Sequence, residues 1–282
     1  MGQIFFQDNM PEMVRVSATT ATLAATHMGQ PTQLTVGGQQ YAPATTLTLD
    51  TATNGFGGLD TGTLSATHSQ YYVYAVVQSG VLGLIASLSG PSTGPAGFTS
   101  AYKLVGAFFS MDSGSQIGSM ITISGEATSE FQRFTPALSN AGSKVFTRNG
   151  VWRREGSNMR IRFDYDGDAT PSGSATSTLV LGNMPTPFTC ETSKLNRSDS
   201  VDLFANRIGQ ASSAGMHVSA GAVTNDVPCS MFDSSRWSFW RAWDGVGHAT
   251  TKLRMSDINV SRTVQLTGEV VIPVSGWSKT LL

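Results

Sequence analysis

The stretch Tyr71-Tyr72-Val73-Tyr74-Ala75-Val76-Val77-Gln78-Ser79-Gly80-Val81-Leu82-Gly83-Leu84-Ile85-Ala86-Ser87 decides the fold class. Two runs of β-branched and aromatic residues flank a polar turn at residues 78–80, which is the pattern of a β-hairpin. The turn also interrupts the most apolar part of the chain, and a transmembrane helix needs about 20 apolar residues. The stretch therefore predicts a hairpin and no insertion into a membrane.

Strand patterns recur along the rest of the chain, and no window carries the sustained apolar stripe of a helix. Segments rich in Gly and Pro, such as residues 89–95, separate the strands. We expect strands near Val14–Ala18, Gln33–Val36, Thr46–Leu49, Tyr71–Val77, Val81–Ser87, Tyr102–Phe109, Met120–Ser124, Lys144–Phe146, Val151–Arg154, Met159–Tyr165, Ser177–Leu181, Val201–Ile208, Met216–Val223, Thr263–Leu266 and Glu269–Val274. Short strands at regular spacing indicate an all-β protein built from sandwiches, jelly rolls or barrels.

Two of these strands differ in the spacing of their apolar residues. In residues 160–165, the apolar Ile161, Phe163 and Tyr165 alternate with charged residues. This alternation predicts one face in a core and one face in water or in an interface. Residues 104–109 are apolar on both faces, which predicts a strand buried on both sides, either within the domain or against another subunit.

The chain has 282 residues and a mass of 29.8 kDa, which suits one large β domain or two of ordinary size. Residues 1–45 are rich in Thr, Ala and Gln and hold few large apolar groups, so we expect an extended N-terminal arm or edge strands there. A boundary near Gly125–Ser129 would separate a β domain over residues 46–125 from a C-terminal, jelly-roll-like β domain over residues 126–282.

Charge and composition narrow the classes of partner. The chain has 18 Lys and Arg against 19 Asp and Glu, a net charge of −1, which argues against nucleic acid and anionic membranes as partners. Only 13% of the residues are charged, against about 25% in an average domain. Such surfaces suit repeated packing of subunits. The first residues lack the pattern of a signal peptide, so we expect synthesis in a cytoplasm.

The residues with reactive side chains form no familiar catalytic motif. The chain has no nucleophile elbow between a strand and a helix, since its one G-x-S-x-G match, at residues 90–94, lies in a Gly- and Pro-rich loop. It also lacks the zinc-protease motif, the phosphate-binding loop and the dinucleotide fingerprint. Each of the four His stands alone in the sequence. We therefore expect no enzymatic activity and no cofactor. Cys190 and Cys229 are open to two interpretations, a disulfide or two free thiols.

An acidic run offers the best candidates for a metal site. Asp164, Asp166 and Asp168 alternate along the chain, and alternate carboxylates can converge on Ca²⁺. Ala175 stands where a helical calcium loop would need a Glu. The alternative is an acidic exit from a strand, without metal.

The densest aromatic segment is Trp237-Ser238-Phe239-Trp240-Arg241-Ala242-Trp243. Exposed rings beside Arg can bind a sugar by stacking and hydrogen bonding, which makes Trp237, Trp240, Arg241 and Trp243 candidate ligand-binding residues. The alternative is that these rings fill a core or a subunit interface.

Five arginines lie within residues 148–162, at positions 148, 153, 154, 160 and 162. They fit either contact with an anionic glycan or an acidic subunit, or solvated strand faces paired with Glu155, Asp164 and Asp166. The candidate interface residues are Arg153, Arg154, Phe108 and Phe109.

Several segments resemble modules of tailed-bacteriophage structural proteins. They are the hairpin of residues 71–87, Pro95-Ala96-Gly97-Phe98-Thr99, residues 102–108, the W-R-R-x-G-x-x-M pattern of Trp152–Met159, and Val270–Ser278. The resemblance covers about residues 60–278 and identifies the chain as similar to tail-fibre-like and other surface-exposed virion proteins.

The resemblance implies a non-enzymatic virion protein made in the host cytoplasm. We expect a short tail-fibre or appendage component that forms a homotrimer, with residues 1–45 docking to other virion proteins and the C-terminal domain contacting a host-surface glycan. One alternative is a capsid decoration protein, a cement or head fibre that stabilises the shell. An exposed cluster at residues 237–243 would favour the glycan binder. A less favoured alternative is a glycan depolymerase, which would need two carboxylates facing each other in a groove.

Overall fold

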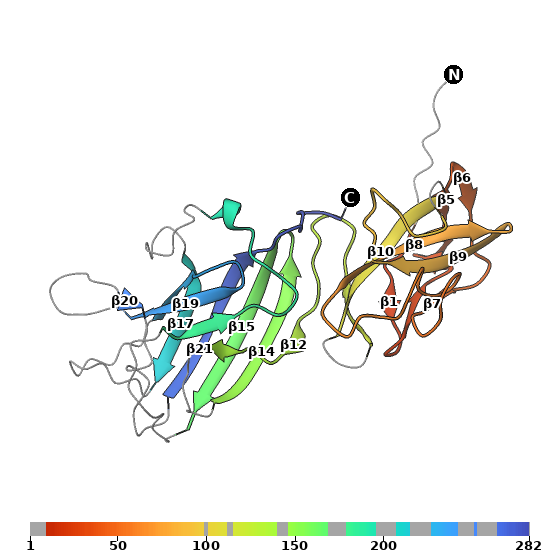
Figure 1. The fold of residues 1–282 in the computed structure, drawn as a ribbon. Helices are drawn as coiled ribbons and strands as arrows, with labels where there is room; N and C mark the ends of the chain where they lie inside the picture. Colours follow the sequence, from red (N-terminus) through yellow and green to blue (C-terminus); the bar gives the residue numbers. More distant parts are fainter. Residues whose placement is uncertain are drawn as a thin grey trace. The chain divides into compact units, whose positions relative to one another are not determined.

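The structure, a computed structural model, describes residues 10–98, 101–111, 115–139, 146–168, 179–195, 207–214, 227–241, 251–252 and 264–281. The chain forms two compact units (Figure 1). The first unit consists of Met1–Glu130 and Ser278–Leu282, and the second of Phe131–Trp277. The division lies one residue beyond the predicted stretch Gly125–Ser129. The return of the last residues to the first unit has no signal in the sequence.

The first unit holds two main sheets and two small hairpins. The strand order of the smaller main sheet is β1 (Val14–Arg15), β2 (Thr20–Leu23) and β7 (Leu47–Asp50). The order of the other main sheet is β11 (Ile117–Ile121), β10 (Tyr102–Ser110), β8 (Gln70–Gln78) and β9 (Val81–Ser87). The small hairpins pair β3 (Thr26–His27) with β4 (Gln30–Pro31) and β5 (Leu34–Val36) with β6 (Gln39–Tyr41).

Strands β8 and β9 form the predicted hairpin, with Gln78 opposite Val81. The two turn residues, Ser79 and Gly80, have φ angles of 52° and 80°. A two-residue turn with both φ angles positive matches the right-handed twist of the flanking strands. The turn residues therefore set the register that pairs the two apolar runs.

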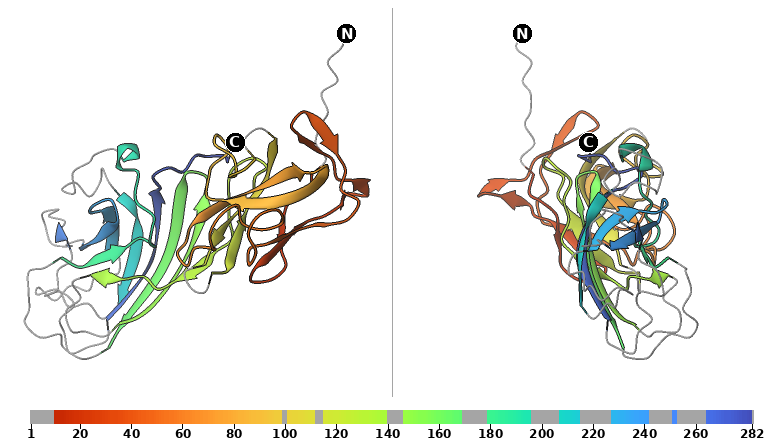
Figure 2. Two further views of the ribbon diagram at one scale, coloured as in Figure 1. Left: turned by 45° about the vertical axis from the view of Figure 1, so that its right-hand side comes forward. Right: turned by 90° about the vertical axis from the view of Figure 1, so that its left-hand side faces the viewer.

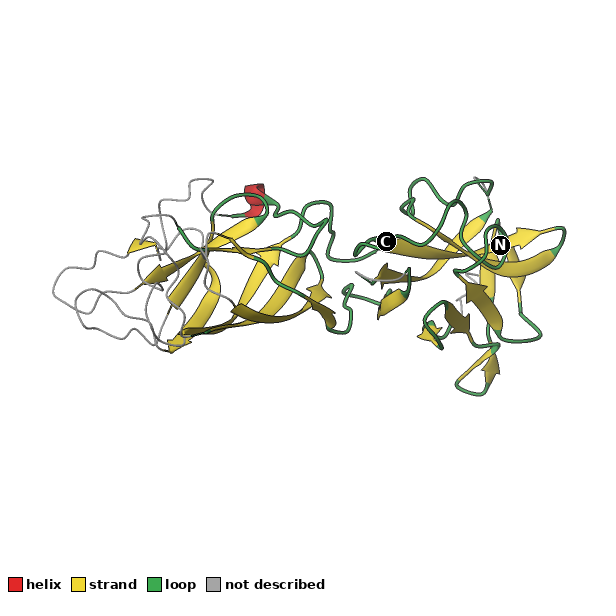
Figure 3. Ribbon diagram, turned by 60° about the horizontal axis from the view of Figure 1, so that its bottom comes forward, coloured by secondary structure: helices red, strands yellow, loops and turns green. Residues whose placement is uncertain are grey.

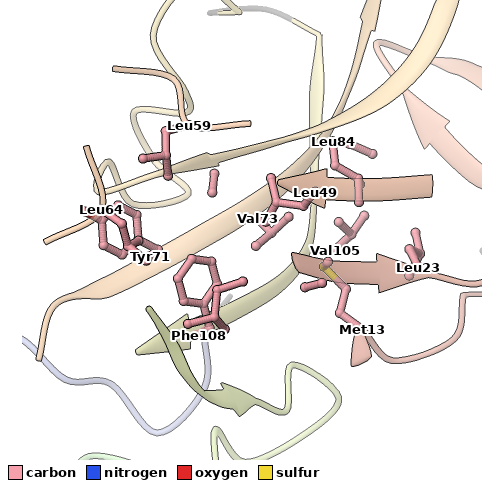
Figure 4. Close-up of a cluster of buried hydrophobic side chains, with 14 of the residues drawn as sticks. Met13, Leu23, Leu49, Leu59, Leu64, Tyr71, Val73, Leu84, Val105 and Phe108 are labelled. Atoms are coloured by element: carbon pink, nitrogen blue, oxygen red, sulfur yellow. The ribbon is translucent and has the colours of Figure 1, made fainter. Parts of the chain in front are cut away.

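The described part of residues 1–45 forms short strands that belong to the core of the first unit, which corrects the prediction of an extended arm; of the alternative, edge strands, β1 is an example. Leu23 is fully buried in the same cluster as Val73 and Phe108 (Figure 4). Leu34 belongs to this cluster and is also fully buried. One apolar face of the β8–β10 sheet needs a cover, and a second layer of strands supplies it. The few apolar side chains between positions 10 and 45 pack against this face.

Strand β10 is buried on both sides within the chain itself. Phe108 stacks on Tyr71 in the core, with ring centroids 5.3 Å apart, and Phe109 on the other face has no exposed surface. On that other face, the hydroxyls of Tyr74 and Tyr102 donate hydrogen bonds to carbonyls of the Gly- and Pro-rich loop. Phe108 and Phe109 are therefore core residues, and the prediction that they form a subunit interface is corrected.

The second unit contains one large antiparallel sheet (Figure 2). Its strand order is β12 (Gln132–Phe134), β14 (Phe146–Glu155), β15 (Asn158–Gly167), β21 (Val264–Pro273), β17 (Arg207–Ala214), β18 (Val227–Met231), β19 (Arg236–Arg241), β16 (Leu181–Asn183) and β13 (Leu138–Ser139). A short strand, β20 (Thr251–Lys252), pairs with β19. The 3-10 helix η1 (Thr192–Lys194) is the only helix in the described residues (Figure 3).

This sheet folds over on itself, so that one sheet makes a sandwich-like core. Strands β12 and β13 lie at the two ends of the strand order, but only residues 135–137 separate them in the sequence. Four residue steps span at most about 14 Å, so the two ends of the sheet come close together. The hydroxyl of Tyr165 on β15 reaches this connection and donates a hydrogen bond to the carbonyl of Ala137, at 3.3 Å.

The predicted alternation on β15 is confirmed. Ile161, Phe163 and Tyr165 are buried, while Arg160, Arg162, Asp164 and Asp166 occupy the outer face with partial or full exposure. The all-β class is also confirmed. No helix of the described residues has the length and apolar character needed to cross a membrane.

The sequence pattern did not reveal β18 and β19, nor several short strands, which are β2, β3, β4, β6, β12, β13 and β20. Strands β18 and β19 are buried along most of their length, so they lack the alternation that marks a half-exposed strand. The predicted strand Met216–Val223 lies outside the described residues.

Candidate functional site

The first rings of the predicted aromatic segment alternate between the two faces of β19, and they are buried on both. The ring of Trp237 points into the folded sheet and lies 5.7 Å from Phe163, centroid to centroid, with no exposed surface. Phe239 lies beside it, 5.8 Å from Phe163. A ligand cannot stack on a ring in this position, so Trp237 is corrected from a candidate binding residue to a core residue.

Trp240 lies on the opposite face of β19 and is also buried, with 5% exposure. Its indole N–H donates a hydrogen bond to the Ser230 hydroxyl at 2.6 Å. Ser230 and Ser238 are buried beneath it with their hydroxyl oxygens 3.2 Å apart. Trp240 therefore covers a small polar interior, and its ring offers no open stacking face.

Two cationic side chains surround these rings. The ammonium of Lys252 lies 5.3 Å from the ring centroid of Trp240 and 5.1 Å from that of Phe232, and the guanidinium of Arg236 lies 5.3 Å from Phe232. We call these four residues, Phe232, Arg236, Trp240 and Lys252, the Lys252 cluster. Cations over aromatic faces contribute about 0.5–1 kcal/mol each at exposed sites and more when desolvated.

The turn between β18 and β19 positions the cluster. One carboxylate oxygen of Asp233 accepts hydrogen bonds from the backbone N–H groups of Ser235 and Arg236, each at 2.9 Å. Its other oxygen accepts a bond from Arg236 Nε at 2.6 Å. Burial alone would raise the pKa of the Asp233 carboxyl, but the hydrogen bonds from Arg236 and Ser235 lower it below its ordinary value. The turn therefore holds Arg236 against Phe232.

Lys252, unlike Arg236, has no counter-ion among the residues that the structure describes. Asp233 neutralises Arg236, whereas the structure gives the Lys252 ammonium neither an acidic partner nor a hydrogen bond within the described chain. Burial against the rings lowers the pKa of the Lys252 ammonium. A partly desolvated cation without a counter-ion is a place where a carboxylate gains binding energy.

Of the other two candidate binding residues, Arg241 and Trp243, the structure describes only the backbone of Arg241. Arg241 ends β19 and pairs with Thr251 in the backbone ladder, but its side chain lies outside the described residues, as does all of Trp243.

The arginine patch divides between the two faces of the second unit. On the outer face, Arg153 and Arg160 both donate to Glu155 Oε1 at 2.8 Å, and Arg162 donates to Glu269 Oε2 at 2.8 Å. Arg160 also pairs with Glu269. The network supports the interpretation of solvated strand faces paired with acids, with Glu269 in place of the predicted aspartates.

Arg154 lies on the opposite face, where only 1% of its surface is exposed. Its guanidinium lies 4.9 Å from the ring centroid of Trp277, and its Nε donates to the carbonyl of Gly156 at 2.9 Å. A buried side chain cannot meet another subunit, so Arg154 is corrected from an interface residue to a core residue. Arg153 keeps 38% of its side chain exposed and remains a candidate.

Among the described residues, the acidic run is not gathered into a group that could hold a metal ion. Asp164 Oδ1 instead accepts hydrogen bonds from Thr267 at 2.7 Å and Gln265 at 3.3 Å. Within the residues that the structure describes, no three His, Cys, Asp or Glu side chains are grouped so that they could hold a metal ion. Asp166 and Asp168 are therefore not part of such a group either.

Sequence reasoning missed Phe232, Arg236, Lys252 and Glu269. Phe232 and Arg236 flank the Asp233-Ser234-Ser235 turn, a signal that could have indicated a hairpin next to the aromatic segment. Lys252 and Glu269 had no local signal, because each meets its partners through strand pairing.

No protein-family model matches the sequence, and neither a curated protein nor a solved structure matches it.

Proposed function

We propose that the protein is a non-enzymatic structural component of a tailed-phage particle, a short appendage that contacts acidic sugars on the host surface through the Lys252 cluster. The proposal joins the resemblance of the sequence segments to the chemistry of one cluster. The two segments that carry the resemblance in the second unit, Trp152–Met159 and Val270–Ser278, pack together: Met159 pairs with Ile272, and the Ser157 carbonyl accepts from Val274 N–H at 3.0 Å.

The observation that carries the proposal is Lys252, which has no acidic partner among the described residues and shares the partly exposed ring of Phe232 with Arg236. An ammonium and a guanidinium can both donate to one sugar carboxylate. A sugar held by these cations would also contact the partly exposed side chain of Phe232. A single cluster of this size binds weakly, so the proposal includes a homotrimer, in which three copies add avidity.

Binding of polygalacturonate to the purified full-length protein tests the proposal, with neutral dextran as the matched control polymer. Replacing Lys252 by Gln should weaken binding about 10-fold or more, because a charge-assisted hydrogen bond is lost. Lys252→Arg should retain most of the binding, and Lys279→Gln, in the first unit, should leave it unchanged. Equal binding by the wild type and Lys252→Gln would overturn the assignment to this cluster.

Light scattering tests the oligomeric part of the proposal. A stable mass near three times 29.8 kDa supports the trimer, and a monomer contradicts it.

The burial of Trp237 and Trp240 favours a second candidate, a capsid decoration protein. A host-binding appendage was expected to expose these rings, and the sheet encloses them instead. This role predicts saturable binding to empty capsid shells that lack the protein, together with a higher melting temperature of the shell. Failure to bind shells, combined with binding to polygalacturonate, would exclude this second candidate.

A further inference from the structure

The second unit begins and ends on an aromatic residue. The chain enters it at Phe131, directly after Glu130, and leaves it at Trp277, directly before Ser278. The chain therefore passes between the units twice. The rings of both terminal residues lie against arginines of the same strand, β14.

The entry point is held on the outer face of the sheet. The Phe131 ring has the Arg153 guanidinium 4.7 Å from its centroid and the Arg162 guanidinium 4.8 Å from it. Both guanidiniums are oriented by acids, Arg153 by Glu155 and Arg162 by Glu269. The Phe131 ring is thus contacted by arginines of two adjacent strands, β14 and β15.

The exit point is held on the inner face. The Trp277 ring lies 4.9 Å from the Arg154 guanidinium and 5.2 Å from the ring of Phe188. Trp152, two residues before Arg154, lies 6.4 Å from Trp277. Lys194 Nζ also lies 3.5 Å from the Trp277 carbonyl.

We infer that the Arg153–Arg154 pair is a clamp that anchors both ends of the second unit to β14. Successive residues of a strand point to opposite faces of its sheet, so two adjacent arginines can grip one chain end on each face. This gives the Trp152–Gly156 segment of the W-R-R motif a mechanical role. Gly156, with φ of 58°, makes the turn whose carbonyl holds Arg154.

The strands next to the two anchors differ in length and in how many neighbours they pair with. Strand β12, which follows Phe131, has three residues and pairs only with β14, at the end of the strand order. Strand β21, which precedes Trp277, has ten residues and pairs with both β15 and β17. The entry strand therefore depends more on its clamp than the exit strand does. The inference holds whether or not the proposed glycan binding is correct.

Hydrogen exchange of the full chain, followed by mass spectrometry, tests the clamp. Arg153→Met should raise the exchange of residues 132–134 about 3- to 10-fold, because two partly exposed cation–π contacts become one and local opening becomes easier. Exchange of residues 227–231 should stay unchanged. Arg133→Met is the matched control, because Arg133 lies on β12, the strand whose exchange is followed, but holds no ring in the described structure.

The exit anchor has its own test. Arg154→Met should raise the exchange of residues 274–277 and leave residues 132–134 unchanged. If that variant does not fold, Trp277→Leu replaces it and should show the same local increase. Unchanged exchange at 132–134 in Arg153→Met, an equal increase in Arg133→Met, or unchanged exchange at 274–277 in Trp277→Leu would each overturn the inference.

Discussion

The rings of Phe163 and Trp237 lie 5.7 Å apart, although β15 and β19 are separated by three strands in the sheet. Four strand spacings correspond to about 19 Å along a flat sheet. The contact therefore exists because the sheet curls until its two halves face each other. This pair marks the centre of the second unit, with Tyr165 and Phe239 packed around it at 6.3 Å from one another.

Removing this contact should destabilise the second unit. Trp237→Ala is expected to cost about 3–5 kcal/mol of unfolding free energy, because it leaves a large cavity between the sheet halves. All five tryptophans lie in the second unit, so urea unfolding followed by tryptophan fluorescence reports on that unit alone. Thr147→Ala on the exposed part of β14 is the control and should cost little. A loss below about 1 kcal/mol for Trp237→Ala would contradict the folded sheet.

The Gly- and Pro-rich loop of the first unit, residues 89–95, should tolerate Gly90→Ala much better than Gly94→Ala. Gly94 has φ of 72°, and a Cβ there would lie 2.3 Å from Tyr102 Cε1, whereas a Cβ at Gly90 would meet only Tyr72 at 3.9 Å. The hydroxyl of Tyr102 donates to the Pro91 carbonyl at 3.1 Å, which keeps this ring in place. Gly94→Ala should therefore cost about 1–3 kcal/mol and Gly90→Ala much less, measured by scanning calorimetry. Equal melting temperatures for the two variants would show that the loop does not rest on Tyr102.

The outer-face network should make the second unit less stable in acid. The hydrogen bond from Arg160, and then that from Arg153, lowers the pKa of the Glu155 carboxyl below its ordinary value of 4.5. A carboxyl whose pKa is lowered by folding contributes stability above about pH 4.5, and the contribution is lost as the pH falls through the lowered pKa. The effect should be about 1 kcal/mol or less, because the network is partly exposed. Urea unfolding of wild type and Glu155→Gln at pH 7 and pH 3 should show a smaller pH dependence in the variant, and identical dependence would argue against the network.

The two cysteines should be unreactive in the folded protein. Neither forms a disulfide and both are buried, and burial, followed by the nearby Glu191, raises the pKa of the Cys190 thiol to about 11. The thiolate is the reactive form, so labelling with a thiol reagent at pH 8 should proceed at a rate limited by unfolding. Both thiols should react at once in denaturant. A thiol that reacts rapidly in the native protein would contradict the burial of that residue.

Local patterns in the sequence were sufficient for the strands that are half exposed or that flank a tight turn. The Ser79-Gly80 turn predicted the β8–β9 hairpin, and the alternation of Ile161, Phe163 and Tyr165 predicted the two faces of β15. Such patterns depend only on residues next to each other along the chain, because side chains alternate between the faces of a strand. Strands β18 and β19, buried on both faces, gave no such signal.

The sequence analysis placed the candidate binding residues on the aromatic segment, whereas the proposed site uses side chains around it. The aromatic segment near residue 240 does lie at a cluster of rings and cations. Trp237 and Trp240 are enclosed, however, and the accessible side chains of the cluster are Phe232, Arg236 and Lys252. Which ring is buried depends on the curl of the whole sheet, and no short stretch of sequence carries that information.

The sequence by itself determined the all-β class, the central hairpin and the alternation of faces, because each follows from turn chemistry and a period of two residues. Only the tertiary structure decided the pairings between distant strands, such as the one that places Arg162 beside Glu269, 107 residues further along the chain. It also decided that Arg153 and Arg154, neighbours in the sequence, hold opposite ends of one unit. Strand pairing and burial join residues that are far apart in the chain, and their free energy arises only when the entire sheet has formed.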